Sequence, residues 1–189
     1  MLAMYGVTSN RLAPVNEAVR LTPSDPEVQV AQARALLNAG QLTAALPAFE
    51  RAVALQPRNF GLWAELGNAY DLAGKSDEAI TTVKQAVRLA PAYAQPHWQL
   101  GNLLLRKGRR REAFTEFRAT VNADASLFPN TVDLAWGAFN GEASAIEQAI
   151  HPNNDVARLE LAKVFAAHGA VEDAILTRAR QLRVQDKSL

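Results

Sequence analysis

The chain has 189 residues, of which 49% are hydrophobic and 21% are charged, and its formal net charge is +1. This length suits one ordinary domain or a short stack of repeats, and the apolar content is ample for a buried core. The near-neutral charge argues against a generally nucleic-acid-binding surface, and the absence of cysteine excludes disulfides, zinc–thiolate sites and thiol catalysis.

The start of the sequence carries no targeting signal. Residues 1–6 lack the basic flank and the long apolar run of a secretory signal, and nowhere is an uncharged apolar run long enough to span a membrane. We therefore expect a soluble protein without membrane contact, with the cytoplasm as the default location.

Residues 1–25 are predicted to be the second half of a repeat whose first half is absent. Residues 14–21 have helical spacing and align with residues 49–57, one period later. A lone second helix leaves an apolar face without its usual neighbour. That face comprises Val15, Ala18, Val19 and Leu21. Either residues 1–12 fold back over it or the sequence is a piece of a longer protein, and we favour the second alternative.

Three units of equal length follow, at 26–59, 60–93 and 94–127. Each is predicted to form a helix, a tight turn, a second helix and a short connection. A glycine recurs near the end of each first helix, where glycine readily takes the left-handed conformation that closes a helix. These glycines are Gly40, Gly74 and Gly108.

The unit 60–93 shows the pattern most fully. Its first helix carries Trp63, Leu66, Gly67 and Tyr70 at the spacing of one helical stripe. Small residues such as Gly67 predict that the helix axes approach closely. Ser76 is expected to cap the second helix, which should end before a proline because proline cannot continue a helix.

The pattern weakens after residue 127. The unit 128–154 has only 27 residues, with an early turn at Gly141 and a shortened second helix at 143–150. The last unit, 155–189, recovers the spacing, and its polar second helix suits a capping role. The periodicity predicts about 11 helices and no strands.

The recurring aromatic residues, the Leu66-Gly67 pair, Ala79 and the closing Pro91 resemble the tetratricopeptide repeat. The resemblance covers residues 26–127 closely and residues 155–188 less closely. It implies a single all-α domain built as a right-handed superhelical α-solenoid of helical hairpins. It also implies a concave groove, lined mainly by the first helices, that binds short peptide segments of other proteins.

The groove-facing positions adjoin the apolar stripe of each first helix, at about 100° per residue. Val30 and Ala64 are expected on this face. The predicted binding residues are Arg34, Asn38, Asn68, Asp71, Trp98, Asn102, Leu105 and Arg106. An asparagine amide can both donate to and accept from a peptide backbone. The alternative is that Asn68 and Asn102 bond the neighbouring hairpin, and both interpretations stand.

Trp98 takes the place of Ala64, and Trp136 projects likewise if the register survives past residue 128. Two tryptophans with Leu105 would form an apolar pocket for a partner side chain. Alternatively, the unit 128–154 packs over Trp98 and fills the groove. We favour a binding role for Trp98 and a packing role for Trp136.

The one cluster of charge is the basic turn Arg106–Arg111, a candidate for binding an acidic partner. Its candidate anion-binding residues are Lys107, Arg109, Arg110 and Arg111. A solvated turn, partly offset by Glu112 and Glu116, explains it as well, and we favour that explanation. No aromatic residue is interleaved for base stacking, so nucleic acid is not an expected partner.

No constellation predicts catalysis, a metal site or a cofactor. The three histidines are scattered, and Gly74-Lys75-Ser76 lacks the upstream glycine of a phosphate-binding loop. The sequence therefore predicts a non-catalytic adaptor that holds a protein or peptide partner. The alternatives are a structural module that stacks on another repeat or another copy through its N-terminal end, and a weaker one, binding of an anionic partner or nucleic acid through the basic turn.

Overall fold

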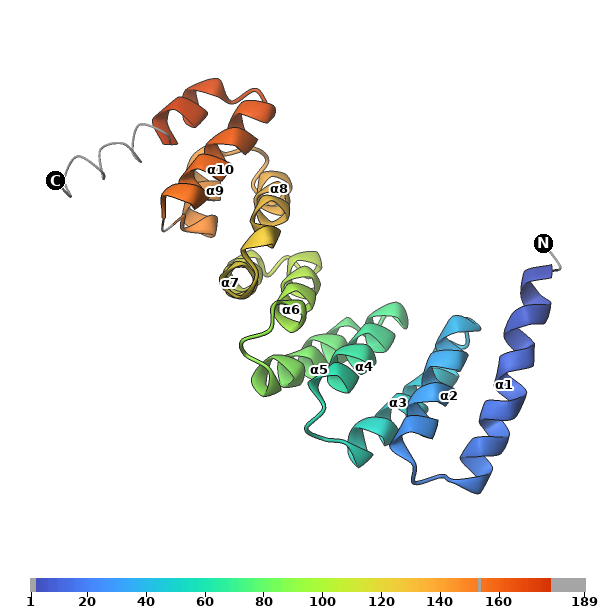
Figure 1. The fold of residues 1–189 in the computed structure, drawn as a ribbon. Coiled ribbons are helices and arrows are strands. Elements are labelled where there is room, and N and C mark those ends of the chain that lie inside the picture. Colours follow the sequence, from blue (N-terminus) through green and yellow to red (C-terminus); the bar gives the residue numbers. More distant parts are fainter. Residues whose placement is uncertain (1–2, 153, 178–189) are drawn as a thin grey trace. The chain divides into compact units, whose positions relative to one another are not determined.

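The structure, a computed structural model, describes residues 3–152 and 154–177. In these ranges the chain forms ten α-helices and one short 3-10 helix, residues 171–177 are also helical, and no strand occurs (Figure 1). The all-α hairpin fold predicted from the periodicity is thus confirmed. The chain divides between Pro91 and Ala92 into two compact units.

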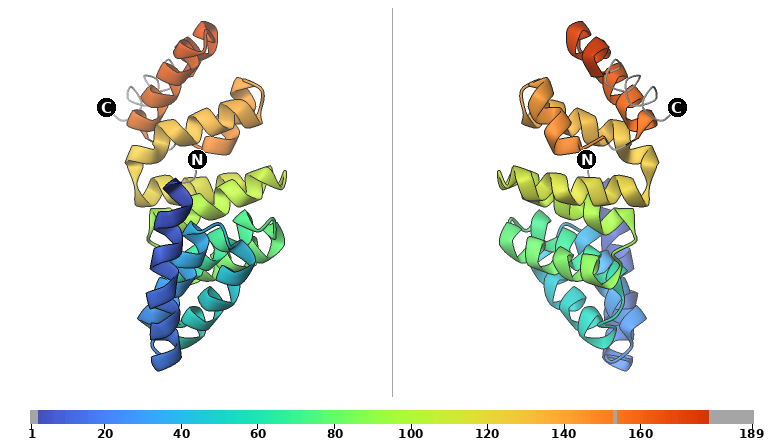
Figure 2. Two further views of the ribbon diagram at one scale, coloured as in Figure 1. Left: turned by 90° about the vertical axis from the view of Figure 1, so that its right-hand side faces the viewer. Right: turned by 90° about the vertical axis from the view of Figure 1, so that its left-hand side faces the viewer.

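The first unit contains one helix followed by two helical hairpins. Its helices are α1 (Ala3–Leu21), α2 (Pro26–Asn38), α3 (Leu42–Leu55), α4 (Phe60–Leu72) and α5 (Ser76–Leu89). The second unit is helical in the same manner. Its elements are α6 (Ala94–Arg106), α7 (Arg110–Ala123), η1 (Ala125–Leu127), α8 (Phe128–Ala138), α9 (Ala143–Ile150) and α10 (Asp155–Ala167). Within each hairpin the two helices pack side by side (Figures 1 and 2).

The first helices start at 26, 60, 94, 128 and 155, the residues at which the sequence places the units. Several are capped by a side chain that accepts a hydrogen bond from the first turn. Asp25 accepts from the backbone N–H of Glu27, and Asn154 accepts from that of Ala157. Such caps satisfy N–H groups that have no partner within the helix, which explains why these helices begin where they do.

The turns within the hairpins use glycine as predicted. Gly40, Gly74 and Gly108 have φ angles of 72°, 75° and 73°, in the left-handed region that other residues enter only at a cost. Gly141 follows with φ 74°, and Gly169 closes α10 with φ 81°. Each glycine reverses the chain directly after its helix.

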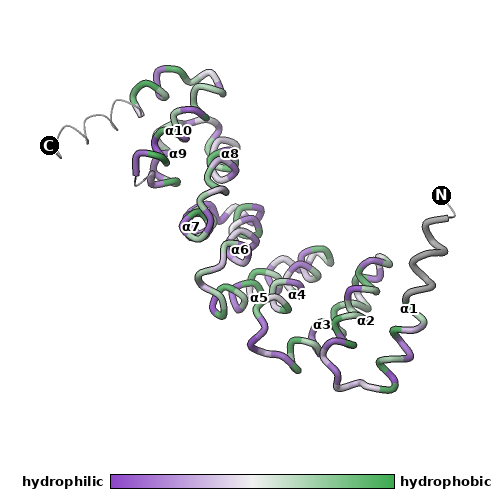
Figure 3. Tube along the Cα trace, viewed as in Figure 1, coloured by the Kyte–Doolittle hydropathy of each residue, from purple (hydrophilic) through white to green (hydrophobic). Residues whose placement is uncertain are grey.

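Hydrophobic and hydrophilic residues alternate around the helices, and the apolar sides meet inside the hairpins (Figure 3). In the first unit Phe49 and the alanines at 45, 48 and 52 have no exposed surface. At Gly67 the space is so tight that an added β-carbon would lie 2.3 Å from Cγ2 of Val83. The small residue of the repeat therefore sets the spacing of the two helices.

The N-terminal helix does not follow the fold-back alternative, which was not the favoured one, and one predicted cap differs from the sequence-based expectation. α1 runs without a break from Ala3 to Leu21, so residues 3–12 extend the helix instead of folding back over it. Pro14 lies inside this helix, where it cannot donate a hydrogen bond to the turn before it. Ser76 is not a cap: Lys75 is the N-cap residue of α5, without a side-chain hydrogen bond, because the glycine turn lets the helix start at Ser76 itself.

The unit 128–154 is short because its second helix is short. α7 has 14 residues and α9 has 8. α9 stops at His151, which takes a left-handed conformation (φ 51°) and precedes Pro152. Since proline disfavours a helical conformation in the residue before it, this pair ends the helix early.

Candidate functional site

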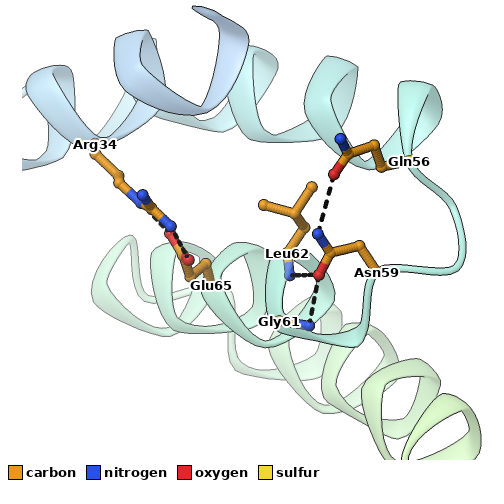
Figure 4. A network of polar contacts seen from close by, with 6 residues as sticks. All are labelled: Arg34, Gln56, Asn59, Gly61, Leu62 and Glu65. Atoms are coloured by element: carbon orange, nitrogen blue, oxygen red, sulfur yellow. Dashed lines mark hydrogen bonds and ion pairs between the residues drawn. The ribbon is translucent and has the colours of Figure 1, made fainter. Parts of the chain in front are cut away.

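In the first unit, Arg34 of α2 binds Glu65 of α4 in a bidentate ion pair (Figure 4). Nε of Arg34 donates to Oε2 of Glu65 at 2.8 Å, and Nη2 donates to Oε1. The hydrogen bond to Glu65 raises the pKa of Arg34 above its usual value. The Arg34 side chain is 56% exposed, so the pair serves more to orient the guanidinium than to add stability.

The sequence analysis missed Glu65, although a signal was present. Glu65 lies 31 residues after Arg34. This separation is shorter than the length of one repeat by about one helical turn. Opposite charges at that separation lie on facing first helices. The same close-up shows how α4 is anchored: Asn59 accepts from the backbone N–H groups of Gly61 and Leu62 and donates to Gln56 (Figure 4).

The remaining predicted residues of this unit differ in exposure. Asn38 and Asn68 are exposed, and Asp71 is half-buried. No hydrogen bond links the Asn68 amide to another residue of the described chain, so both its donor and its acceptor face solvent. Val30 and Ala64 are buried, at 4% and 5% exposure, and do not lie on an open face as expected. They join the core because this side of the helix also faces the neighbouring hairpin.

In the second unit, Trp98 is half-buried and packs on Phe117 of its own hairpin, with ring centroids 5.3 Å apart. Asn102 is also half-buried, and its Nδ2 donates to the backbone carbonyl of Trp98 at 2.8 Å. The Asn102 amide is therefore partly used within α6, one turn from Trp98.

Leu105 and Arg106 line a pocket of about 420 Å³ between the end of α6 and α8, here called the α6–α8 pocket. Its further lining residues are Gly108, Arg110, Asp133, Leu134, Gly137 and Ala138. The lining combines leucine and alanine side chains with two guanidinium groups and one carboxylate. Such a mixture can hold an apolar side chain and also bond the backbone on either side of it.

Trp136 packs against α10. Its ring stacks on His168 with centroids 4.2 Å apart and 13° between the planes, and it also contacts Phe165. The structure thus places Trp136 in the packing of the shortened hairpin against the last one, and Trp136 does not line the α6–α8 pocket.

Comparison with known families identifies the repeat. A tetratricopeptide repeat model matches residues 30–94, which span the hairpins from α2 to α5. Residues 30–94 therefore carry tetratricopeptide repeats. No curated protein matches the sequence.

Solved structures of MamA share this fold. The structure named MamA RS-1 ArsTM double mutant has 26% identity and a TM-score of 0.60, and the match covers 66% of this chain and 70% of that one. A crystal structure of MamA protein has 16% identity, covering 86% and 92% of the two chains, with a TM-score of 0.59. MamA MSR-1 C2 has 19% identity, covering 99% and 92%, with a TM-score of 0.53.

The tetratricopeptide fold typically provides a scaffold for protein–protein interaction, and the repeats with their structural neighbours support that class of role here. Among the described residues, no group of three or more His, Asp or Glu side chains is placed to hold a metal ion. No helix in the described part of the chain is both long and apolar enough to cross a membrane.

The residues of the basic turn differ in their partners. Arg109 binds Glu112 through two hydrogen bonds of 2.7 and 2.6 Å, which offsets its charge. Arg110 and Arg111 open α7 and are exposed. Lys107 is exposed as the C-cap residue of α6. The positive charge of the turn is therefore partly offset by Glu112, a feature of the solvated-turn explanation given above.

Proposed function

We propose that the chain is an adaptor that binds an extended peptide segment of a partner protein on the first helices of its hairpins. In the second unit, the α6–α8 pocket would take an apolar side chain of that segment. The supporting observation is that Leu105 and Arg106, two residues singled out by their position in the repeat, line this pocket together with α8.

In the first unit, taken by itself, Asn68 would bond the backbone of a partner segment. Its amide is exposed, and it follows the Arg34–Glu65 pair by about one turn of α4. Asn102 has a smaller share in this proposal, because it is half-buried and one of its two Nδ2–H donors is already bonded to the Trp98 carbonyl. Trp98, half-exposed beside Asn102, would add an apolar contact.

The test starts with a dodecapeptide selected against the purified protein from a random phage-displayed library, followed by titration of that peptide against variants. We expect Leu105→Ala to weaken binding about tenfold or more, as loss of an anchoring side chain does. Asn68→Ala should cost about fivefold, the value of one net hydrogen bond of ~1 kcal/mol. Melting temperatures should stay close to that of the wild type.

Leu55→Ala is the matched control, because Leu55 is a partly exposed leucine at the end of a second helix, 41% exposed. It should leave peptide binding unchanged. If Leu55→Ala weakens the peptide as much as Leu105→Ala does, or if both Leu105→Ala and Asn68→Ala bind normally, the groove assignment is wrong.

A second candidate function is assembly through α1. Leu21 is 73% exposed, and Val15 and Val19 are half-buried on a helix that packs against α2. Exposed apolar side chains of this kind mark interfaces. A further repeat or a second copy of the chain would cover them.

A further inference from the structure

A second pocket lies between α7 and α9, on the second helices of their hairpins, and shares only Arg110 with the lining of the α6–α8 pocket. This α7–α9 pocket has a volume of about 480 Å³. Its lining residues are Arg110, Arg111, Phe114, Thr115, Arg118, Phe139, Ala145, Gln148, Ala149 and His151. Three guanidinium groups and one imidazole thus surround a single concavity.

The pocket carries positive charge without a local counter-charge. None of the described residues that line it is acidic. The acidic residues of α7 and α9 bond elsewhere, in the pairs Arg109 with Glu112, His97 with Glu116, and Thr177 with Glu147. Arg111 and Arg118 therefore present their charge to an incoming ligand, in contrast to Arg109 on the same turn.

Arg118 is held in place by the shortening of α9. Its Nη1 donates to the carbonyl of Ala149 at 2.6 Å, and its Nη2 donates to Oγ1 of Thr115 at 3.1 Å. The last four carbonyls of a helix lack partners within the helix, so the early end of α9 supplies the acceptor. Both acceptors are neutral, and the guanidinium keeps its full charge in a fixed orientation.

The floor of the pocket is apolar. Phe114 is 1% exposed, and its ring contacts that of the half-buried Phe139 with centroids 5.2 Å apart. Ala145 and Ala149 of α9 continue this surface. Phe114 is covered by the protein itself, whereas Phe139, Ala145 and Ala149 are half-buried and leave apolar surface beside the arginines, which an apolar group of the ligand can cover.

The spacing of the cations decides between a single anion and an acidic segment. Arg111 and Arg118 are seven positions apart on α7, which places their Cα atoms about 10 Å apart along the helix axis at 1.5 Å per residue. A single phosphate would have to draw the Arg111 side chain along α7 toward Arg118, which is bonded to Ala149, so a segment with two separated carboxylates suits the pair better. Three residues of extended peptide cover about 10 Å.

We propose that the α7–α9 pocket binds an acidic segment of a partner protein, with carboxylates about three to four residues apart and an apolar side chain between them. The carboxylates bond Arg111 at one end and Arg118 with His151 at the other, and the apolar side chain contacts the half-buried Phe139 and Ala145. The two pockets share Arg110, whereas Arg111, Arg118 and His151 line the α7–α9 pocket and not the α6–α8 pocket.

The probe is the fluorescein-labelled peptide Gly-Glu-Glu-Leu-Gly-Glu-Glu-Gly, followed by fluorescence anisotropy with the full chain. We expect binding that weakens about tenfold in Arg111→Gln and in Arg118→Gln, the range of one charge-assisted hydrogen bond. Arg88→Gln removes the same charge from exposed Arg88 of α5 and should change nothing. Arg118 also bonds the end of α9, so Arg118→Gln could unfold this helix. Binding by this variant is therefore measured only at temperatures where its circular dichroism matches that of the wild type. Arg111→Gln needs no such control.

Companion titrations settle the class of ligand. The same peptide with Gln for Glu should lose binding, and the peptide with Gly for Leu should bind more weakly. Absence of binding by the acidic peptide, equal loss in Arg88→Gln, displacement by inorganic phosphate, or tighter binding of an oligouridylate would each overturn the proposal. Leu105→Ala should leave this probe unaffected, which separates the outcome from that of the α6–α8 pocket.

Discussion

Replacing Gly101 with alanine tests how closely α6 packs on α7. A β-carbon at Gly101 would lie 2.6 Å from Cε1 and 2.7 Å from Cδ1 of Phe117, whereas ordinary van der Waals contacts lie at 3.4–4 Å. Phe117 has no exposed surface, and its ring contacts both Trp98 and Phe114, with centroids 5.3 and 5.4 Å away. The ring cannot yield without displacing a further aromatic side chain.

Two effects of opposite sign determine the free energy of unfolding of this variant. Overpacking a core costs ~1–3 kcal/mol. Alanine in place of glycine inside a helix gains ~1 kcal/mol. With Phe117 confined, the middle of the overpacking range applies, and the net destabilisation is about 1 kcal/mol. For a chain of this size that lowers the melting temperature by roughly 2–4 °C.

Gly137→Ala is the matched control within the same unit. Gly137 is an exposed residue of α8, and a β-carbon there would meet nothing within 4 Å. Only the helix-propensity gain remains, so the melting temperature should rise. Thermal unfolding followed by far-ultraviolet circular dichroism compares the two variants. If Gly101→Ala is stabilised as much as Gly137→Ala, the tight contact with Phe117 does not exist and the reasoning fails.

Further predictions concern a hydrogen bond, the N-terminal helix and local stability. Burial and the hydrogen bond that Tyr70 donates to Glu50 at 2.6 Å raise the pKa of Tyr70 to about 12. The neutral phenol therefore stabilises the fold fully below pH 10, and this contribution disappears as pH rises through about 12. Tyr70→Phe should cost about 1 kcal/mol at neutral pH and should abolish this pH dependence, which unfolding titrations from neutral pH to pH 12 would detect. Because the Tyr70 side chain is partly exposed to solvent, the change in the free energy of unfolding with pH should be smaller than the pKa change alone implies. The chain should self-associate with rising concentration through α1, and Val15→Asp with Val19→Asp should lower that association; sedimentation of a strict monomer at high concentration would contradict this. Among the internal units, amide hydrogen exchange should be slowest in residues 60–93 and fastest in residues 128–154. The stability of a repeat protein is roughly the sum of its units and of the interfaces between neighbours, and α9, with only 8 residues, has a small interface. Equal protection of both units would contradict this expectation.

Much of this fold follows from local sequence signals. The recurring glycines require left-handed turns, the prolines end the second helices, and the apolar stripe of each first helix repeats at a constant interval. Each of these signals acts within a few residues of its own position, so the helices at 26–55 and 60–89 can be placed without knowledge of the rest. The same helical geometry predicts which positions adjoin the apolar stripe; of these, Asn38 and Asn68 are exposed, whereas Val30 and Ala64 are buried.

Tertiary structure decided which neighbour each side chain meets. Ala33, Gly67 and Gly101 occupy equivalent positions, yet the sequence does not reveal that Phe117 fills the space at Gly101 while Val83 fills it at Gly67. The partner of Arg34, the stacking of Trp136 on His168 and the hydrogen bond from Arg118 to Ala149 all join residues 31 or 32 positions apart. Helical periodicity fixes the face on which a side chain lies, but contacts of this range depend on how far one helix is rotated and shifted along the next. That rotation and shift are set by the packing of the whole hairpin.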